Sequence, residues 1–282
     1  MRLKGLASQA AFATQAILAA LCLITQGFAE ELRGGEQTTL RLPPREDDRP
    51  KVAIVIDDLG LDWRRFEAVD ALPLPLTLGF LPYGVHAQAM LDSASPRHEP
   101  ILHLPMEPRR DKSSAGPDMV SPGPPESIRA SLTKNLRKLT GYRGINNHTG
   151  SRMTANRAGM TVVLKELAAA ELYFLDSGTT GRPVAASLAE DTGAIVLQAD
   201  LFIDGDQGRR GRPHAERQLD LLVHLARKNG SAIGIGHPYP ETLAAIAGWA
   251  EDKSAAVRFV TVGELAEEQG FETEAEVSAL RF

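Results

Sequence analysis

Short apolar, β-branched runs alternate with longer amphipathic stretches from residue 51 onward, and this alternation predicts strands and helices in turn. Residues 52–56 are apolar at every position, as in a strand buried on both faces. Within 126–139, Ile128, Leu132 and Leu136 recur at helical spacing. The pattern predicts eight strands, at 52–56, 76–80, 100–104, 142–146, 172–175, 194–197, 232–235 and 258–262. It predicts a helix after each of them, at 62–72, 86–93, 126–139, 157–170, 183–190, 213–228, 241–251 and 263–269.

Repeated strand–helix units predict an α/β fold. We expect a single distorted (β/α) barrel with parallel strands and the helices outside, over residues 51–270. An open, doubly wound sheet satisfies the same alternation and is the alternative. No internal repeat or second domain is evident, and we expect 271–282 to be a C-terminal tail.

The first fifty residues lack this alternation. Two basic residues precede an apolar stretch over 10–24, and the small residues Gly27 and Ala29 follow it. This layout predicts a cleavable signal peptide at 1–29, with an uncleaved N-terminal anchor as the alternative. The apolar stretch is short for a bilayer, so we expect no stable membrane span after cleavage. Residues 30–50 are rich in Gly, Pro and charge, which predicts a flexible linker.

The composition is globular, with 43% hydrophobic and 24% charged residues and a formal net charge of −5. An acidic chain without a run rich in Lys and Arg argues against nucleic acid as a partner. The single cysteine, Cys22, lies in the predicted signal peptide, so disulfides and Cys-based zinc sites are excluded. An exported chain without disulfides is expected in a bacterial periplasm.

Polar side chains follow the predicted strands at their carboxyl ends, where a (β/α) barrel carries its active site. They include Asp57, Asp58, His103, Glu107, Asn147, His148, Asp176, Asp200, Asp204 and His237. Two histidines and one aspartate match a divalent metal site that keeps a position open for water. The residues alone leave plainer roles open: Asp58 as a helix cap, His103 as a core residue and His237 as a turn residue.

Six short motifs resemble those of the divergent polysaccharide deacetylase family. They are IDDLG at 56–60, HLPME at 103–107, NHTGS at 147–151, FLDS at 174–177, FID at 202–204 and GHP at 236–238. The likeness extends over about residues 51–269. The family is a branch of the carbohydrate esterases with the NodB-like fold, so the resemblance implies a distorted (β/α) barrel here.

The resemblance also implies roles for individual residues. Asp57 is expected to be the catalytic base and His237 the catalytic acid. Asp58, His103 and His148 are expected to hold a divalent metal, Zn²⁺ by preference. Residues expected to support these or to contact substrate are Glu107, Asn147, Ser151, Asp176, Asp200 and Asp204.

The chain departs from the esterase pattern at one point. The usual motif has two histidines four residues apart, whereas here Arg152 follows His148 at that spacing and Glu107 follows His103. We therefore expect each of the two histidines to contribute one ligand from neighbouring strands.

The function implied by the resemblance is metal-dependent hydrolysis that removes N-acetyl groups from an envelope polysaccharide or oligosaccharide. A catalytically degenerate protein of the same fold, which binds glycan or serves as a cell-envelope partner, is the alternative. A hydrolase of another bond, such as a phosphoester, is a third. Acetate release by the protein and by an Asp57 variant discriminates among them.

Overall fold

The computed structural model describes residues 49–205 and 209–271. The predicted signal peptide (1–29), nearly all of the predicted linker (30–50) and all but the first residue of the predicted tail (271–282) lie outside these residues. Within the described part, no helix combines the length and apolar character needed to cross a membrane.

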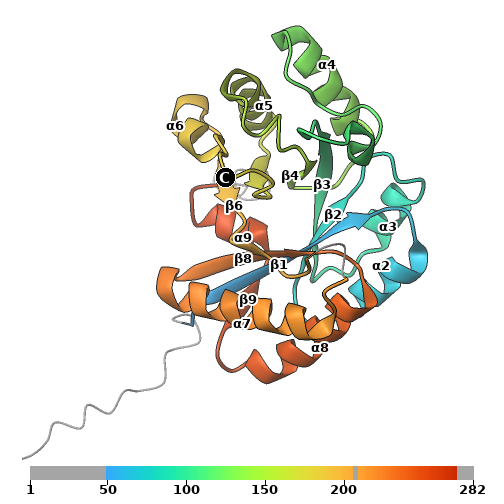
Figure 1. The fold of residues 1–282 in the computed structure, drawn as a ribbon, viewed down its shortest axis with the longest axis vertical. Helices are drawn as coiled ribbons and strands as arrows, with labels where there is room; N and C mark the ends of the chain where they lie inside the picture. The colour runs from blue at the N-terminus through green and yellow to red at the C-terminus, as the bar shows by residue number, and fades with distance from the viewer. Residues whose placement is uncertain (1–48, 206–208, 272–282) are drawn as a thin grey trace, which may run out of the picture. The chain divides into compact units, whose positions relative to one another are not determined.

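Parallel strands joined into one sheet organise the described residues (Figure 1). The strands are β1 (Lys51–Leu59), β2 (Thr77–Phe80), β3 (Glu99–Met106), β4 (Gly144–Thr149), β5 (Tyr173–Asp176), β6 (Val196–Gln198), β7 (Leu201–Phe202), β8 (Ser231–Gly236) and β9 (Arg258–Val260). Their order is β6-β5-β4-β3-β2-β1-β8-β7, so the sheet follows the chain and then wraps from β1 to β8. A doubly wound sheet would reverse direction at its centre, so this order confirms the distorted barrel.

The curled sheet differs from a regular barrel at two places. Among the described strands, β6 and β7 do not pair with each other, so the barrel stays open between them. One edge of β1 has two partners. β9 pairs with its first residues, Lys51–Ala53, and β2 pairs with the same strand from Val55 onward. The two-residue strand β7 was not predicted, because periodicity needs a longer run to be visible.

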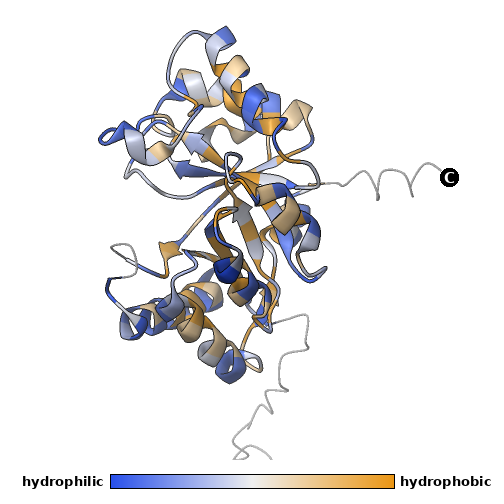
Figure 2. Cartoon of the chain, turned by 90° about the vertical axis from the view of Figure 1, so that its right-hand side faces the viewer, coloured by the Kyte–Doolittle hydropathy of each residue, from blue (hydrophilic) through white to orange (hydrophobic). Residues whose placement is uncertain are grey.

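Helices connect the strands and pack on the outer face of the sheet (Figure 1). They are α2 (Trp63–Asp70), α3 (Ala87–Ser93), α4 (Pro125–Leu136), α5 (Arg157–Ala169), α6 (Ala189–Thr192), α7 (Arg212–Asn229), α8 (Pro240–Lys253) and α9 (Val262–Glu267), with the 3₁₀ helices η2 (Lys112–Ala115) and η3 (Ala186–Leu188). The apolar stripe predicted for this helix is confirmed on α4, because Ile128 and Leu132 are buried. Figure 2 shows hydrophobic and hydrophilic stretches on the same helices, as amphipathic packing requires.

The barrel interior has an apolar middle and polar ends. The middle is filled by inward side chains that include Val55, Ile101, Leu175 and Ile235. At the amino ends of the strands, Glu99 Oε2 accepts hydrogen bonds from Thr77 Oγ1 at 3.1 Å and from the Gly263 backbone N–H at 2.7 Å. At the carboxyl ends, inward alternation brings polar side chains of β1, β3, β4 and β8 to one mouth.

Candidate active site

Asp57 and Asp58 are adjacent in β1, yet the chain turns both toward the barrel mouth. Asp57 continues the inward alternation of Val55, so Asp58 in a regular strand would point outward. Instead Asp58 has a φ of 61°, in the left-handed region, and the register with β2 shifts between Ile56 and Leu59. This local bulge re-aims the Asp58 side chain.

The alternative role of Asp58 as a helix cap is wrong. The N-cap of α2 is Asp62, whose Oδ1 accepts hydrogen bonds from the backbone N–H groups of Arg64 at 2.9 Å and Arg65 at 3.4 Å. The Asp58 carboxylate therefore does not cap α2 and can interact with other groups at the barrel mouth.

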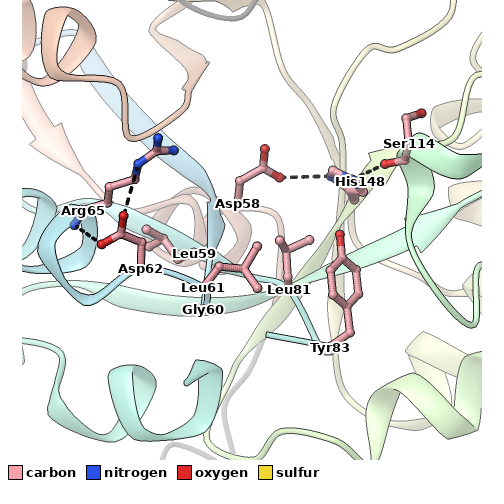
Figure 3. A pocket seen from close by; sticks show the side chains of 10 residues that line it. All are labelled: Asp58, Leu59, Gly60, Leu61, Asp62, Arg65, Leu81, Tyr83, Ser114 and His148. Atoms are coloured by element: carbon pink, nitrogen blue, oxygen red, sulfur yellow. Dashed lines mark hydrogen bonds and ion pairs between the residues drawn. The ribbon is translucent and has the colours of Figure 1, made fainter. Parts of the chain in front are cut away.

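Asp58, His103 and His148 meet at the mouth from three different strands. Asp58 Oδ1 lies 3.4 Å from His103 Nε2 and 3.1 Å from His148 Nδ1, and the two nitrogens are 2.9 Å apart. Figure 3 shows Asp58 and His148 directed toward each other above the pocket. Such separations are those of neighbouring ligands around a divalent ion at bond lengths of about 2.0–2.2 Å.

The outer nitrogen of each ring lies against an oxygen acceptor, so a neutral ring that donates there has no proton on its inner nitrogen. His103 Nδ1 lies 2.7 Å from Asn146 Oδ1, and His148 Nε2 lies 2.9 Å from the backbone oxygen of Ser114. Both partners only accept, so each ring donates there, and its neutral form leaves a lone pair on the inner nitrogen. Carbonyl and amide acceptors orient metal-binding histidines in the same way.

Three acceptor atoms therefore face one another without a donor. Asp58 Oδ1 is buried and has no hydrogen-bond partner among the described residues. Burial raises the pKa of Asp58, but the hydrogen bonds and charge of protonated His103 and His148 outweigh it and lower the pKa far below its ordinary value. A cation between the three residues favours the ionised carboxylate in the same way. A proton on one ring would satisfy one of the three contacts, whereas a cation between them satisfies all three. The three residues fit a metal ion.

Asp57 lies below this cluster and is 1% exposed. Asn146 Nδ2 donates to both of its oxygens, at 2.8 and 3.0 Å, and His103 Nδ1 is 3.5 Å from Oδ1. Burial raises the pKa of Asp57, because desolvation outweighs the attraction of His103 and His237. Gly79 of β2 provides the space for this carboxylate.

Asn146 is a site residue that the sequence analysis missed in favour of Asn147. Asn146 bridges Asp57 and His103, whereas Asn147 Oδ1 accepts a hydrogen bond from the Ser177 backbone at 2.9 Å and orders a loop. The signal was present, because two-residue alternation puts Asn146 on the same strand face as His148.

His237 and Asp204 form a pair on the other side of the mouth. His237 Nδ1 lies 2.9 Å from Asp204 Oδ1, while Asp204 Oδ2 accepts hydrogen bonds from the His237 backbone at 2.6 Å and Thr242 Oγ1 at 3.1 Å. Burial lowers the pKa of His237, but Asp204 more than offsets it and raises the pKa to about 9. His237 Nε2 lies 3.9 Å from Asp58 Oδ2. A protonated imidazole thus faces the cluster of Asp58, His103 and His148.

The remaining candidates do not join the cluster. Ser151 Oγ accepts a hydrogen bond from the Arg109 backbone at 3.0 Å, and Asp176 Oδ1 accepts one from Gly178 at 2.9 Å. Asp200 Oδ2 accepts from the Ile233 backbone at 2.8 Å, in a groove that shares no residue with the pocket at the mouth. Glu107 is buried beside the mouth and contacts cations instead.

A pocket of about 300 Å³ opens beside Asp58 and His148. Its lining is Asp58, Leu59, Gly60, Leu61, Asp62, Arg65, Leu81, Tyr83, Ser114 and His148 (Figure 3). The volume is at the lower end of small-ligand sites, and the lining mixes carboxylate, guanidinium, hydroxyl and apolar groups. A small polar ligand in this pocket would lie against Asp58 and His148.

The sequence matches one protein family and two proteins from bacteria. The model of the family described as "Divergent polysaccharide deacetylase" matches residues 54–266. The chain is 37% identical over 198 residues to the uncharacterized protein YibQ of Escherichia coli (strain K12), a match covering 68% of this chain and 60% of YibQ. The chain thus spans less than two thirds of that relative. An uncharacterized protein of Haemophilus influenzae is 32% identical over 218 residues, which cover 76% of each chain.

One solved structure has the same fold at clear sequence similarity. The uncharacterized protein ATU2773 from Agrobacterium tumefaciens C58 superposes with a TM-score of 0.72 and 31% identity, over 77% of this chain and 89% of that chain. The barrel described here is therefore shared with ATU2773.

Proposed function

This chain belongs to the divergent polysaccharide deacetylase family, and from that premise we propose that it is a metal-dependent hydrolase that removes N-acetyl groups from a glycan. One observation carries the proposal: one ligand atom each of Asp58, His103 and His148 converges beside a polar pocket. Imidazole and carboxylate ligands in threes, with space for a further ligand, are the donor set of hydrolytic zinc sites.

When bound by these three residues, a divalent ion, Zn²⁺ by preference, would polarise the amide carbonyl and lower the pKa of a bound water. Asp57 is proposed to accept the proton of the attacking water. Its raised pKa makes it a stronger base than an ordinary aspartate. His237 is proposed to give its proton to the departing amine nitrogen as the C–N bond breaks. Asp204 keeps the His237 ring oriented and charged. The products are acetate and a free amino sugar.

The pocket and the predicted export of the chain support the proposed substrate class. Asp62, Arg65 and Tyr83 offer an acceptor and donors to the hydroxyl groups of a sugar. We propose a periplasmic location after signal cleavage, where N-acetylated envelope glycans are accessible.

Metal content and acetate release test the proposal together. The purified protein is analysed by plasma mass spectrometry, beside His148→Ala and the matched control His224→Ala, whose histidine is exposed on α7. We expect about one ion per chain in wild type and control, and loss of the ion in His148→Ala. Wild type should release acetate from N-acetylglucosamine oligomers, and Asp57→Asn should not.

Two results would change the conclusion. Wild type that binds metal and glycan but releases no acetate supports the catalytically degenerate, glycan-binding alternative. Wild type that takes up no metal after incubation with Zn²⁺, Mn²⁺, Co²⁺ and Ni²⁺ excludes the proposed metal centre.

A further inference from the structure

Glu107 is a buried carboxylate that the proposed chemistry does not use. It follows β3 directly and is 2% exposed. Lys112 Nζ and Arg152 Nη1 each lie 2.5 Å from Oε1, although the side chains of these two cations are 60% and 52% exposed. An exposed ion pair contributes little to stability, but a carboxylate as buried as this one requires its partners.

The main chain of Glu107 joins three segments around the mouth. Its N–H donates to the Val120 oxygen at 2.9 Å, and its oxygen accepts from the backbone N–H groups of Arg152 and Met153, both at 3.1 Å. The end of β3, the loop that contains η2, and the loop after β4 are thus tied to one residue.

The loop that contains η2 supports His148. Lys112 begins η2, and Ser114 within η2 presents the backbone oxygen that receives His148 Nε2–H at 2.9 Å. Asp111 enters the segment with a φ of 41°, and Gly116 leaves it with a φ of 77° against the Tyr83 ring. A single 3₁₀ turn has little burial of its own, so its position depends on anchors at its two ends.

We propose that Glu107 is a positioning residue for the metal centre, acting through Lys112 on η2 and through Arg152 on the loop after β4. By holding the Ser114 oxygen against His148, the ion-pair cluster keeps the proton on Nε2 and the lone pair of Nδ1 directed at Asp58. This rests on the metal centre of the proposed function. It also accounts for the two positions four residues after the histidines: Glu107 and Arg152 bind each other and leave the ligand set at three.

Metal affinity and the protonation site of His148 test this inference. Affinity for Zn²⁺ is measured by competition with a chromogenic chelator, and the His148 tautomer by ¹⁵N NMR on the metal-free protein. The variants are Glu107→Gln, Lys112→Ala and Lys112→Arg, with Arg129→Ala as control, since Arg129 forms an exposed pair with Glu166 at 2.7 Å elsewhere.

We expect Glu107→Gln to weaken Zn²⁺ binding by about 10- to 100-fold, as loss of outer support does in other metal sites. Lys112→Ala should weaken it in the same direction, and Lys112→Arg should restore it to within about threefold of wild type. The same two weakened variants should lose the pure Nε2–H tautomer of His148. Lys112 is exposed, so its variants remain informative if Glu107→Gln does not fold.

The outcomes separate this inference from the proposed function. Unchanged affinity and an unchanged tautomer in Lys112→Ala and Glu107→Gln would overturn the positioning role while leaving the metal centre intact. If wild type binds no Zn²⁺, the proposed function fails, and the NMR measurement alone decides whether the Glu107 cluster positions His148.

Discussion

Gly79 of β2 lies directly beside Asp57 of the paired strand β1, and an alanine there tests where that carboxylate lies. A Cβ at Gly79 would stand 2.3 Å from Asp57 Oδ1, 3.3 Å from its Cγ and 3.4 Å from its Cα. Gly79 does not have a left-handed φ, so alanine is compatible with its backbone. The contact with Asp57 therefore sets the effect of the substitution.

The magnitude follows from how tightly the carboxylate is held. Ordinary van der Waals contact with a Cβ begins at 3.4 Å, so Oδ1 has to move by about 1 Å. Asp57 is 1% exposed and accepts two hydrogen bonds from Asn146, at 2.8 and 3.0 Å, so that movement breaks at least one of them. Overpacking costs about 1–3 kcal/mol, and a hydrogen bond to a charged group is worth about 1.5–3 kcal/mol. We expect Gly79→Ala to lower the free energy of unfolding by about 2–5 kcal/mol, or Tm by about 5–15 °C.

Urea and thermal unfolding measure this loss in a double-mutant cycle with Asp57→Ala. Without the carboxylate, Gly79→Ala should cost far less, so the coupling energy should be about 2 kcal/mol or more. Gly181→Ala is the control, because a Cβ there meets no atom within 4 Å. Equal losses in the wild-type and Asp57→Ala backgrounds would refute the placement of Asp57 against Gly79.

Two further predictions concern the titration of Glu99, at the amino ends of the strands, and of His237, at the mouth. Burial raises the pKa of Glu99 above 4.5, so the folded protein binds this proton more tightly than the unfolded chain and stability falls as pH rises from about 4.5. Glu99→Gln should flatten that part of the profile in urea unfolding, and a slope equal to that of wild type would contradict it. Burial lowers the pKa of His237 but Asp204 raises it to about 9, so its stabilisation is present below about pH 6.5 and is lost as pH rises through 9. Asp204→Asn should move the His237 titration, followed by NMR on the metal-free protein, to lower pH, and an unmoved titration would show that Asp204 does not control it.

The barrel was predictable because its evidence is local. Buried parallel strands are continuous apolar runs and their helices carry apolar stripes, so the order of elements is visible in the chain. Polar residues at strand ends also predicted that Asp58, His103 and His148 would share one mouth, since parallel strands end on the same side.

Side-chain direction at the strand ends was beyond the sequence. The left-handed φ of Asp58 and the bulge beside it depend on the pairing of β1 with β2. No local residue pattern predicts them. A strand at 258–262 was predicted, but the pairing of β9 with the amino half of β1 was visible only in the structure.

By itself, the sequence determined the fold class, the mouth and the residue types that gather there. Only the tertiary structure decided which of them touch. Alternation places Asn146 on the strand face of His148, but only the register of β3 with β4 brings it against His103 and Asp57. Glu107 and Arg152 form an ion pair across 45 residues of chain, a contact made by two loops whose approach depends on the whole curled sheet. Such contacts are non-local, so their partners are specified by packing and not by spacing.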